Sequence, residues 1–257
     1  MGRFFAVDLS RAALVAFAVL ADSPIVVTAQ QTARVHYIKI ADNPDDYVRV
    51  EGALLKSSAL KMVKQGTLRS WSLYQPDGPS RNYDFAVLAI EGISGGLDDK
   101  SLTAIYSDPR AVVRREVWNL VDEVRPESQS SGVCSNSAHS TNESQMATVH
   151  YLRAKANGRE DYLRMERNLW KPAHELLVRE NKICSWWLYE VRSAVTNGND
   201  FLTFTVYDES QRDFGKYEGS ALMAVHPDKT LDSINRRTRD IRDTVGREIW
   251  KLVADCR

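Results

Sequence analysis

The sequence predicts an α+β protein in which a β-α-β-β-α-β unit occurs twice within one chain of 257 residues. The first observation is an internal duplication, because five short segments of the first half recur in the same order in the second half. The second is that alternating apolar segments are separated by segments with apolar residues at helical spacing. The matched segments are 35–38 with 149–152, 46–51 with 161–166, 70–74 with 185–189, 84–85 with 200–201, and 115–121 with 247–253.

The elements of the two copies are expected in the same order, except that the second copy carries an insertion before its last element. Gly66 and Asn181 are residue types that commonly end a helix, and they follow the two expected first helices. Alternating apolar residues indicate the strands, and turn residues mark where the strands end. The expected order is strand 34–40 or 148–154, helix 43–64 or 159–181, strand 67–75 or 182–191, strand 84–91 or 200–208, polar helix 98–114 or 228–244, and strand 116–124 or 248–254.

This order is that of a ferredoxin-like unit. The helices of such a unit cover only one face of its four-stranded sheet. The other face would be exposed and apolar, and an exposed apolar face of that size is unusual in a soluble protein. We therefore expect two tandem ferredoxin-like repeats, 33–125 and 147–257, packed sheet to sheet as an intramolecular pseudo-barrel. A linker rich in Ser and Asn, 126–146, joins them.

Residues 1–29 are expected to form a signal peptide. The ten-residue apolar run Ala12–Ala21 has the length of a signal core and is too short to span a bilayer. Pro24 follows, and Ala29 ends a segment that suits signal peptidase. Cleavage there would export the mature chain to the periplasm or the outside of the cell, with no stable membrane span. An uncleaved N-terminal anchor is the alternative.

The three cysteines fit export without requiring it. Cys134 lies in the polar linker and Cys256 is the penultimate residue, so both are expected near the surface. In an oxidising compartment these two could form a disulfide, and two free thiols are the alternative. Cys184, in an apolar strand, is interpreted as a small buried side chain. No spacing of Cys and His indicates a metal site.

Composition and motifs exclude several functions. Lys plus Arg and Asp plus Glu both number 34, so the chain has no net positive charge with which to bind nucleic acid. The sequence holds no GxSxG, P-loop, GxGxxG or HExxH motif. The pairs Arg115/Glu116 and Arg247/Glu248 are interpreted as structural ion pairs.

The first candidate site residues lie where the two copies differ. The segment 170–174 (Trp-Lys-Pro-Ala-His) matches 55–59 of the first copy, which has no Trp, Pro or His. A proline inside a helix costs about 3 kcal/mol and bends it. The spacing of Trp170 and His174 places both on one face of that helix, where His174 could act as a general base. A helix break at Pro172, with His174 at the surface, is the alternative.

Aromatic residues of the following strand are the second group of candidates. Strand alternation puts Trp187 and Tyr189 on one face with Ile183, and Trp186 on the other with Cys184. Aromatic side chains that line a cavity suit a flat or lipophilic ligand, whereas ordinary core packing is the alternative.

Two further histidines occupy equivalent strand positions in the copies. His36 and His150 alternate with Ile38 and Leu152, which places them on apolar faces. His36 is a candidate ligand-binding residue and His150 a candidate catalytic residue. Histidines satisfied within the core are the alternative.

The topology, the duplication and the Trp-Lys-Pro-Ala-His helix with its Trp-rich strand resemble the dimeric α/β-barrel superfamily over about residues 33–256. That superfamily includes NIPSNAP-like, antibiotic-biosynthesis monooxygenase-like and chlorite dismutase-like proteins. The resemblance is greatest to uncharacterised exported members, and it implies no specific catalytic residue.

Three functions are consistent with this sequence. The leading hypothesis is an exported barrel that binds a small hydrophobic or aromatic molecule with Trp170, Trp187, Tyr189 and His36. The second is a cofactor-independent monooxygenase or isomerase in which His174 or His150 is the base. The third is a structural or interaction protein without a ligand. No cofactor is expected, although the resemblance leaves haem as a weaker variant, and oligomer formation is left open.

Overall fold

We describe the protein from a computed structural model. It describes residues 31–41, 44–78, 82–92, 97, 111–126, 144–155, 158–192 and 199–256. The expected signal peptide 1–29, Cys134 and most of the expected linker lie outside the described residues, as does most of the expected polar helix 98–114.

Eight antiparallel strands form a closed barrel. Around the barrel their order is β1-β3-β2-β8-β5-β7-β6-β4, so β1 lies opposite β5 and β4 opposite β8. The strands are β1 (Thr32–Ile38), β2 (Leu68–Pro76), β3 (Phe85–Glu91), β4 (Val112–Val124), β5 (Gln145–Ala154), β6 (Ser185–Val191), β7 (Phe201–Asp208) and β8 (Arg242–Cys256).

Each copy supplies a four-stranded sheet, and the two sheets join at both edges. The first sheet has the order β2-β3-β1-β4 and the second β6-β7-β5-β8. Strand β2 pairs with β8, and β4 pairs with β6, so each joint links the two copies. The expected fold class is therefore confirmed. Because the barrel closes within one chain, none of its strands presents an unpaired edge.

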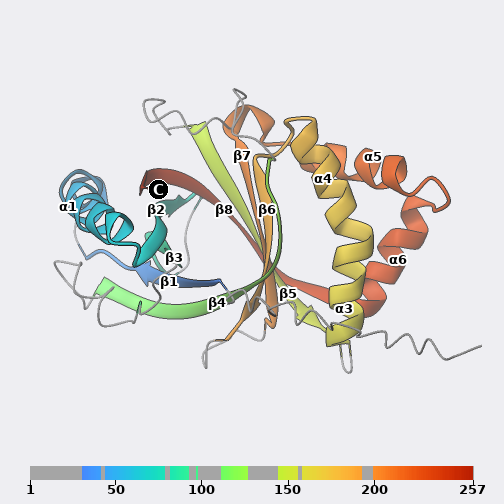
Figure 1. The fold of residues 1–257 in the computed structure, drawn as a ribbon, viewed down its shortest axis with the longest axis horizontal. Coiled ribbons are helices and arrows are strands. Elements are labelled where there is room, and N and C mark those ends of the chain that lie inside the picture. The colour runs from blue at the N-terminus through green and yellow to red at the C-terminus, as the bar shows by residue number, and fades with distance from the viewer. Residues whose placement is uncertain are drawn as a thin grey trace, which may run out of the picture.

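Helices cover opposite sides of the barrel, as Figure 1 shows. Helix α1 lies at the left, and helices α3 to α6 lie together at the right. The bounds are α1 (Pro44–Lys64), α3 (Arg159–Met165), a π-helical turn η3 (Glu166–Trp170), α4 (Lys171–Arg179), a short 3₁₀ turn η4 (Glu209–Gln211), α5 (Gly215–Val225) and α6 (Leu231–Ile241). Helix α5 lies in the insertion of the second copy. Within the described residues, no helix is long and apolar enough to span a bilayer.

The last strand of each copy begins earlier than the sequence predicts. Strand β4 begins at Val112 rather than 116, and β8 begins at Arg242 rather than 248. Ile38 of β1 pairs with Val112, and Ala154 of β5 pairs with Arg242. Pairing with β1 and β5 therefore draws the polar segments that precede 116 and 248 into strands β4 and β8. Hydrogen bonds to a neighbouring strand outweigh the local helical spacing at these positions.

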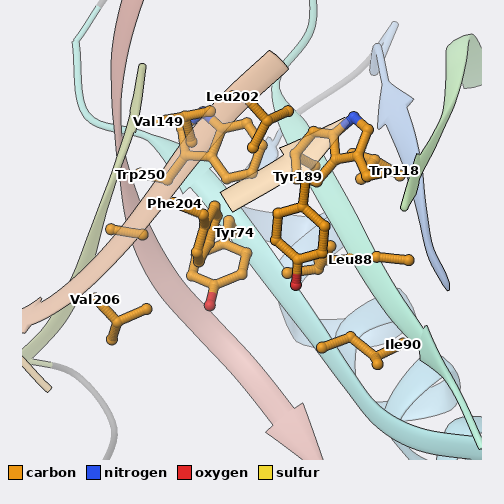
Figure 2. Packing of buried hydrophobic residues seen from close by; sticks show 14 of the residues in the cluster. Tyr74, Leu88, Ile90, Trp118, Val149, Tyr189, Leu202, Phe204, Val206 and Trp250 are labelled. Atoms are coloured by element: carbon orange, nitrogen blue, oxygen red, sulfur yellow. The ribbon is translucent and has the colours of Figure 1, made fainter. Parts of the chain in front are cut away.

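Buried side chains form three clusters, one in the barrel interior and one beneath the helices on each side. Figure 2 shows part of the interior, where Tyr74 and Phe204 lie near Trp250, and Trp118 lies beside Tyr189. The rings of Trp118 and Trp250, one from each copy, stack at 6.4 Å between centroids. Equivalent residues of the duplication therefore meet inside the barrel.

The cysteines do not form the disulfide that the sequence left possible. Cys256 is a free, buried thiol in the apolar layer under α1, so it does not pair with Cys134. Burial raises the pKa of this thiol to about 11. Cys184, which was interpreted as a simple buried side chain, is disulfide-bonded. Strand β8 carries Cys256 into the core, which the sequence position near the C-terminus does not reveal.

Candidate functional site

His174 lies in a buried cluster between the second sheet and its helices. Its side chain is only 5% exposed, and its ring stacks on Trp186 with centroids 4.9 Å apart. The Nδ1 atom lies 2.8 Å from the carbonyl oxygen of Trp170. Because a carbonyl oxygen can only accept, Nδ1 carries the proton and donates. The neutral ring therefore keeps its lone pair on Nε2.

Burial lowers the pKa of His174 to about 4, so the ring is neutral at pH 7. Its Nε2 atom lies 4.0 Å from Oε1 of Glu218 on α5, which is beyond hydrogen-bond distance. Burial also raises the pKa of the Glu218 carboxyl. The arrangement presents one oriented nitrogen lone pair toward an acidic group.

A π-helical turn positions His174. In η3 the backbone N–H of Lys171 donates to the carbonyl of Glu166, five residues earlier. Pro172, which has no N–H to donate, then lies in the first turn of α4, so the helical segment continues instead of breaking. Trp170 and His174 share one face, as predicted, with ring centroids 6.3 Å apart. Such π-helical turns are frequent at functional sites.

A buried ion pair adjoins the histidine. Glu166 is 1% exposed and forms a close ion pair with Arg242 at the start of β8. The Arg242 guanidinium also lies 5.3 Å from the ring centroid of Trp170 and 5.9 Å from that of Tyr162. Burial raises the pKa of Glu166, although the nearby Arg242 charge opposes that shift. The cluster thus combines an imidazole, two carboxyls and a guanidinium beneath the helices.

His150 is the other predicted catalytic residue, and it belongs to the same layer. It is half-buried on β5, and burial together with Arg247 and Arg242 lowers its pKa to about 4. Its charged form would lower the pKa of His174, so the two imidazoles interact electrostatically. The structure therefore brings His174, His150 and Trp170 to the same side of the second sheet.

The predicted ligand-binding residues do not form one site. Trp187 and Tyr189 belong to the barrel interior, on the opposite face of β6 from Trp186. Trp187 donates from Nε1 to Glu123 at 3.2 Å. His36 is buried on β1 in the other half, on the face opposite Val35. The sheet itself separates these residues from His174.

The faces predicted for the side chains of this segment are correct only for residues within strand β6 itself. Trp187 and Tyr189 share the interior face and Trp186 the helix-covered face, as expected. Cys184 and Ile183 lie on the faces opposite to those predicted. The reason is that β6 begins at Ser185, so the two preceding residues do not follow its alternation.

Sequence reasoning missed a polar cluster at one end of the barrel interior. The Tyr37 hydroxyl donates to Glu116 at 3.0 Å, and the Tyr151 hydroxyl donates to Glu248 at 2.9 Å. The two hydroxyl oxygens, from equivalent positions of the two copies, lie 3.5 Å apart. Burial raises the pKa of both tyrosines, so they remain protonated donors.

This cluster also includes the two stacked tryptophans. Trp118 donates from Nε1 to Glu116 at 2.8 Å, and Trp250 donates to Glu248 at 3.0 Å. The glutamates are thus hydrogen-bond acceptors inside the barrel, and Glu116 forms an ion pair with Arg114. The ion pairs Arg115/Glu116 and Arg247/Glu248 stay predictions. A signal was present, because strand alternation puts each Glu on the same face as the Trp two residues later.

Comparison with known proteins supports the fold alone. No protein-family model and no curated protein matches the sequence. A candidate monooxygenase from Fusobacterium nucleatum superposes with a TM-score of 0.57 at 13% identity, covering 89% of this chain and 94% of that one. A heme-binding protein from Thermus thermophilus gives 0.50 at 11% identity, covering 87% and 91%. A mutant chlorite dismutase from Candidatus Nitrospira defluvii in complex with cyanide gives 0.50 at 14%, covering 88% and 92%.

The chain therefore has the fold of the dimeric α+β-barrel proteins. Its cofactor expectation needs correction. No cofactor was expected from the sequence, but the proteins that share this fold include a heme-binding protein. Within the described residues, no group of three or more His, Cys, Asp or Glu side chains could hold a bare metal ion. A haem-type ligand, which needs a single axial side chain, makes no such demand.

Proposed function

We propose that this chain is a small-molecule-binding α+β-barrel protein whose binding centre is the His174 cluster, and that haem is the group bound there. The observation that carries the proposal is the neutral imidazole of His174, whose Nδ1 proton is held by the Trp170 carbonyl at 2.8 Å. A histidine that ligates a metal has its other ring nitrogen fixed in this manner. The donor chemistry of His174 thus fits a residue that would hold the haem iron.

Other residues of the cluster would orient and balance such a group. Trp186 orients the imidazole ring of His174 by stacking against it, and the π-helical turn η3 positions the helix α4 that carries His174. Arg242 supplies a cation that suits a carboxylate of the ligand. Haem, when bound, supplies a redox-active iron, and its axial ligand and surroundings tune that chemistry. The heme-binding protein from Thermus thermophilus that shares this fold supports haem as the ligand to test.

The alternative of a cofactor-independent monooxygenase has less support. A general base acts best when its pKa lies near the working pH. The pKa values of His174 and His150 are both lowered to about 4, which makes either residue a weak base. A low pKa instead favours a nitrogen that keeps its lone pair available as a ligand.

Titration of the protein with hemin tests the proposal. We expect a shifted, saturable Soret band with one haem per chain, and loss of that band in His174→Ala. His226→Ala is the matched control, because His226 lies in the same helical layer and its Nε2 contacts the carbonyl of Leu169 at 3.1 Å. An unshifted Soret band in the wild type, or an unchanged one in His174→Ala, contradicts the assignment.

We also propose that the mature protein is exported. The disulfide at Cys184 supports this location, because disulfides persist in oxidising compartments. Intact mass measurement of protein recovered from the expressing cells tests it. A mature chain that begins at Gln30 and retains the disulfide is expected. A full-length, reduced chain in the cytoplasm would refute the proposal.

A further inference from the structure

The two copies build the polar end of the barrel differently. In the first copy, the Arg114 guanidinium lies 3.6 Å above the ring centroid of Tyr37. Its Nε atom also lies 3.4 Å from Oε1 of Glu116, whose side chain is buried. Arg114 thus covers the aromatic ring and neutralises the carboxylate of its own copy.

The second copy has the same ring and carboxylate without the arginine. Tyr151 and Glu248 match Tyr37 and Glu116 in the duplication. The strand register pairs Tyr151 with Gly246, as it pairs Tyr37 with Arg114. Glycine therefore stands where the first copy has a cation.

The backbone does not require glycine at this position. Gly246 is not among the described residues with a positive φ, so other residues could adopt its conformation. A Cβ atom built there would meet the Tyr151 ring at 3.4 Å, which is an ordinary van der Waals contact. Because position 246 is glycine, it places no side chain over the Tyr151 ring, whereas Arg114 covers the Tyr37 ring.

At a second position, too, the second copy has a smaller side chain than the first. Tyr83 precedes Asp84-Phe85 in the first copy, and Asn199 precedes Asp200-Phe201 in the second. The equivalence holds in the structure, because the N–H of Asp84 donates to Ile38 at the end of β1, and that of Asp200 donates to Leu152 in β5. Asn199 is 3% exposed, yet within the described residues its Nδ2 has no hydrogen-bond partner.

We propose that the second copy's side of this barrel end binds the cationic group of a small organic molecule, a guanidinium or an ammonium. The cation would lie over the Tyr151 ring and pair with Glu248, as Arg114 does with Tyr37 and Glu116. Cations are attracted both to aromatic faces and, through charge-assisted hydrogen bonds, to carboxylates.

The contacts of Glu248 agree with this role. The hydroxyls of Tyr151 and Tyr83 and the indole N–H of Trp250 all donate to Oε2. Oε1, the oxygen that pairs with arginine in Glu116, accepts no hydrogen bond from the described residues and would receive the ligand. Glu248 is also half-buried, whereas Glu116 is 3% exposed, so the second copy's carboxylate is the more accessible one. The unpartnered Asn199 amide would donate to a polar acceptor elsewhere on the molecule.

This site is separate from the His174 cluster. Tyr151 packs against the interior cluster of the barrel, whereas His174 lies on α4, beneath the helices that cover the outside of the second sheet. Each proposal can therefore fail without the other.

Calorimetric titration with phenylguanidinium, and with phenylurea as its neutral analogue of similar shape, tests the proposal. We expect phenylguanidinium to bind at least tenfold more tightly. Glu248→Gln removes the charge and keeps the shape, and should reduce phenylguanidinium binding at least tenfold. Gly246→Arg places the first copy's guanidinium in the site, and should abolish binding.

Val245→Arg is the matched control. Val245 is 40% exposed and adjacent to Gly246, so the variant adds the same charge at the surface, and binding should be unchanged. Circular dichroism checks that each variant folds, and Glu248→Gln decides the question if Gly246→Arg does not fold. Equal binding of the two probes, no binding of phenylguanidinium, or full binding by folded Gly246→Arg would overturn the proposal.

Discussion

Removal of the Arg242 guanidinium should destabilise the protein strongly at neutral pH. Arg242 forms an ion pair with Glu166, and the two side chains are 14% and 1% exposed. The variant Arg242→Met keeps much of the side-chain volume but leaves the Glu166 carboxylate buried without its cation. Loss of one partner from a buried ion pair typically costs about 3–5 kcal/mol, because the remaining charge is uncompensated. The lost contacts with the Trp170 and Tyr162 rings add to this cost.

The cost should depend on pH in a defined direction. Burial already raises the pKa of Glu166, and removal of Arg242 raises it further. A carboxyl whose folded-state pKa lies above its unfolded value favours folding at low pH and loses that contribution as the pH rises through the folded pKa. The difference between wild type and Arg242→Met should therefore be largest at pH 7 and shrink as the pH falls, because Glu166 then takes up a proton.

Urea unfolding at pH 5, 6 and 7 measures these differences. The surface variant Arg236→Met on α6 is the control and should change the unfolding free energy by less than about 0.5 kcal/mol. The double variant Glu166→Gln/Arg242→Met removes the buried charge as well, and should be more stable at pH 7 than Arg242→Met alone. A cost below about 1 kcal/mol, or a pH-independent one, would show that Glu166 is not held as a buried carboxylate by Arg242.

Two further predictions concern stability. The folded protein holds His174 neutral down to about pH 4 whereas the unfolded chain protonates near pH 6.5, so stability should fall as the pH drops through this window, by up to about 3 kcal/mol from this residue. Urea unfolding of His174→Gln should show a flatter pH dependence, and an unchanged slope contradicts the burial argument. A Cβ at Gly92 would overlap the backbone of Gly66, whereas one at Gly215 meets nothing within 4 Å. Thermal unfolding should therefore show Gly92→Ala destabilised by more than about 2 kcal/mol and Gly215→Ala unchanged or stabilised by about 0.5–1 kcal/mol; equal effects of the two variants would contradict this.

Much of the fold could be predicted because its signals are local or repeated. The alternation in 67–75 and 182–191 identifies strands from neighbouring residues alone. The duplicated segments then require a second copy of the same unit. The boundaries of β4 and β8 could not be predicted, because the hydrogen bonds that extend them come from strands β1 and β5, which are distant in the sequence.

The candidate site was predictable only in part. The spacing of Trp170 and His174 correctly put them on one face of a helix. Their separation from Trp187 and Tyr189 depends on which face of β6 the helices cover, and alternation does not say which face that is. Glu116 contacts its near neighbours Arg114 and Trp118, but its third partner, Tyr37, lies 79 residues earlier and could not be predicted.

The sequence by itself determined that two equivalent β-α-β-β-α-β units stand in one chain, and which residues share each strand face, because both follow from short-range periodicity and from repetition. Only the tertiary structure decided that β2 meets β8 and β4 meets β6, and that equivalent tyrosines and tryptophans consequently face one another inside the barrel. The physical reason is that closure of a sheet juxtaposes residues from opposite copies. Gly246 occupies the position in the second copy that Arg114 occupies in the first. This difference indicates a binding site only because the structure places Tyr151 and Glu248 beside Gly246.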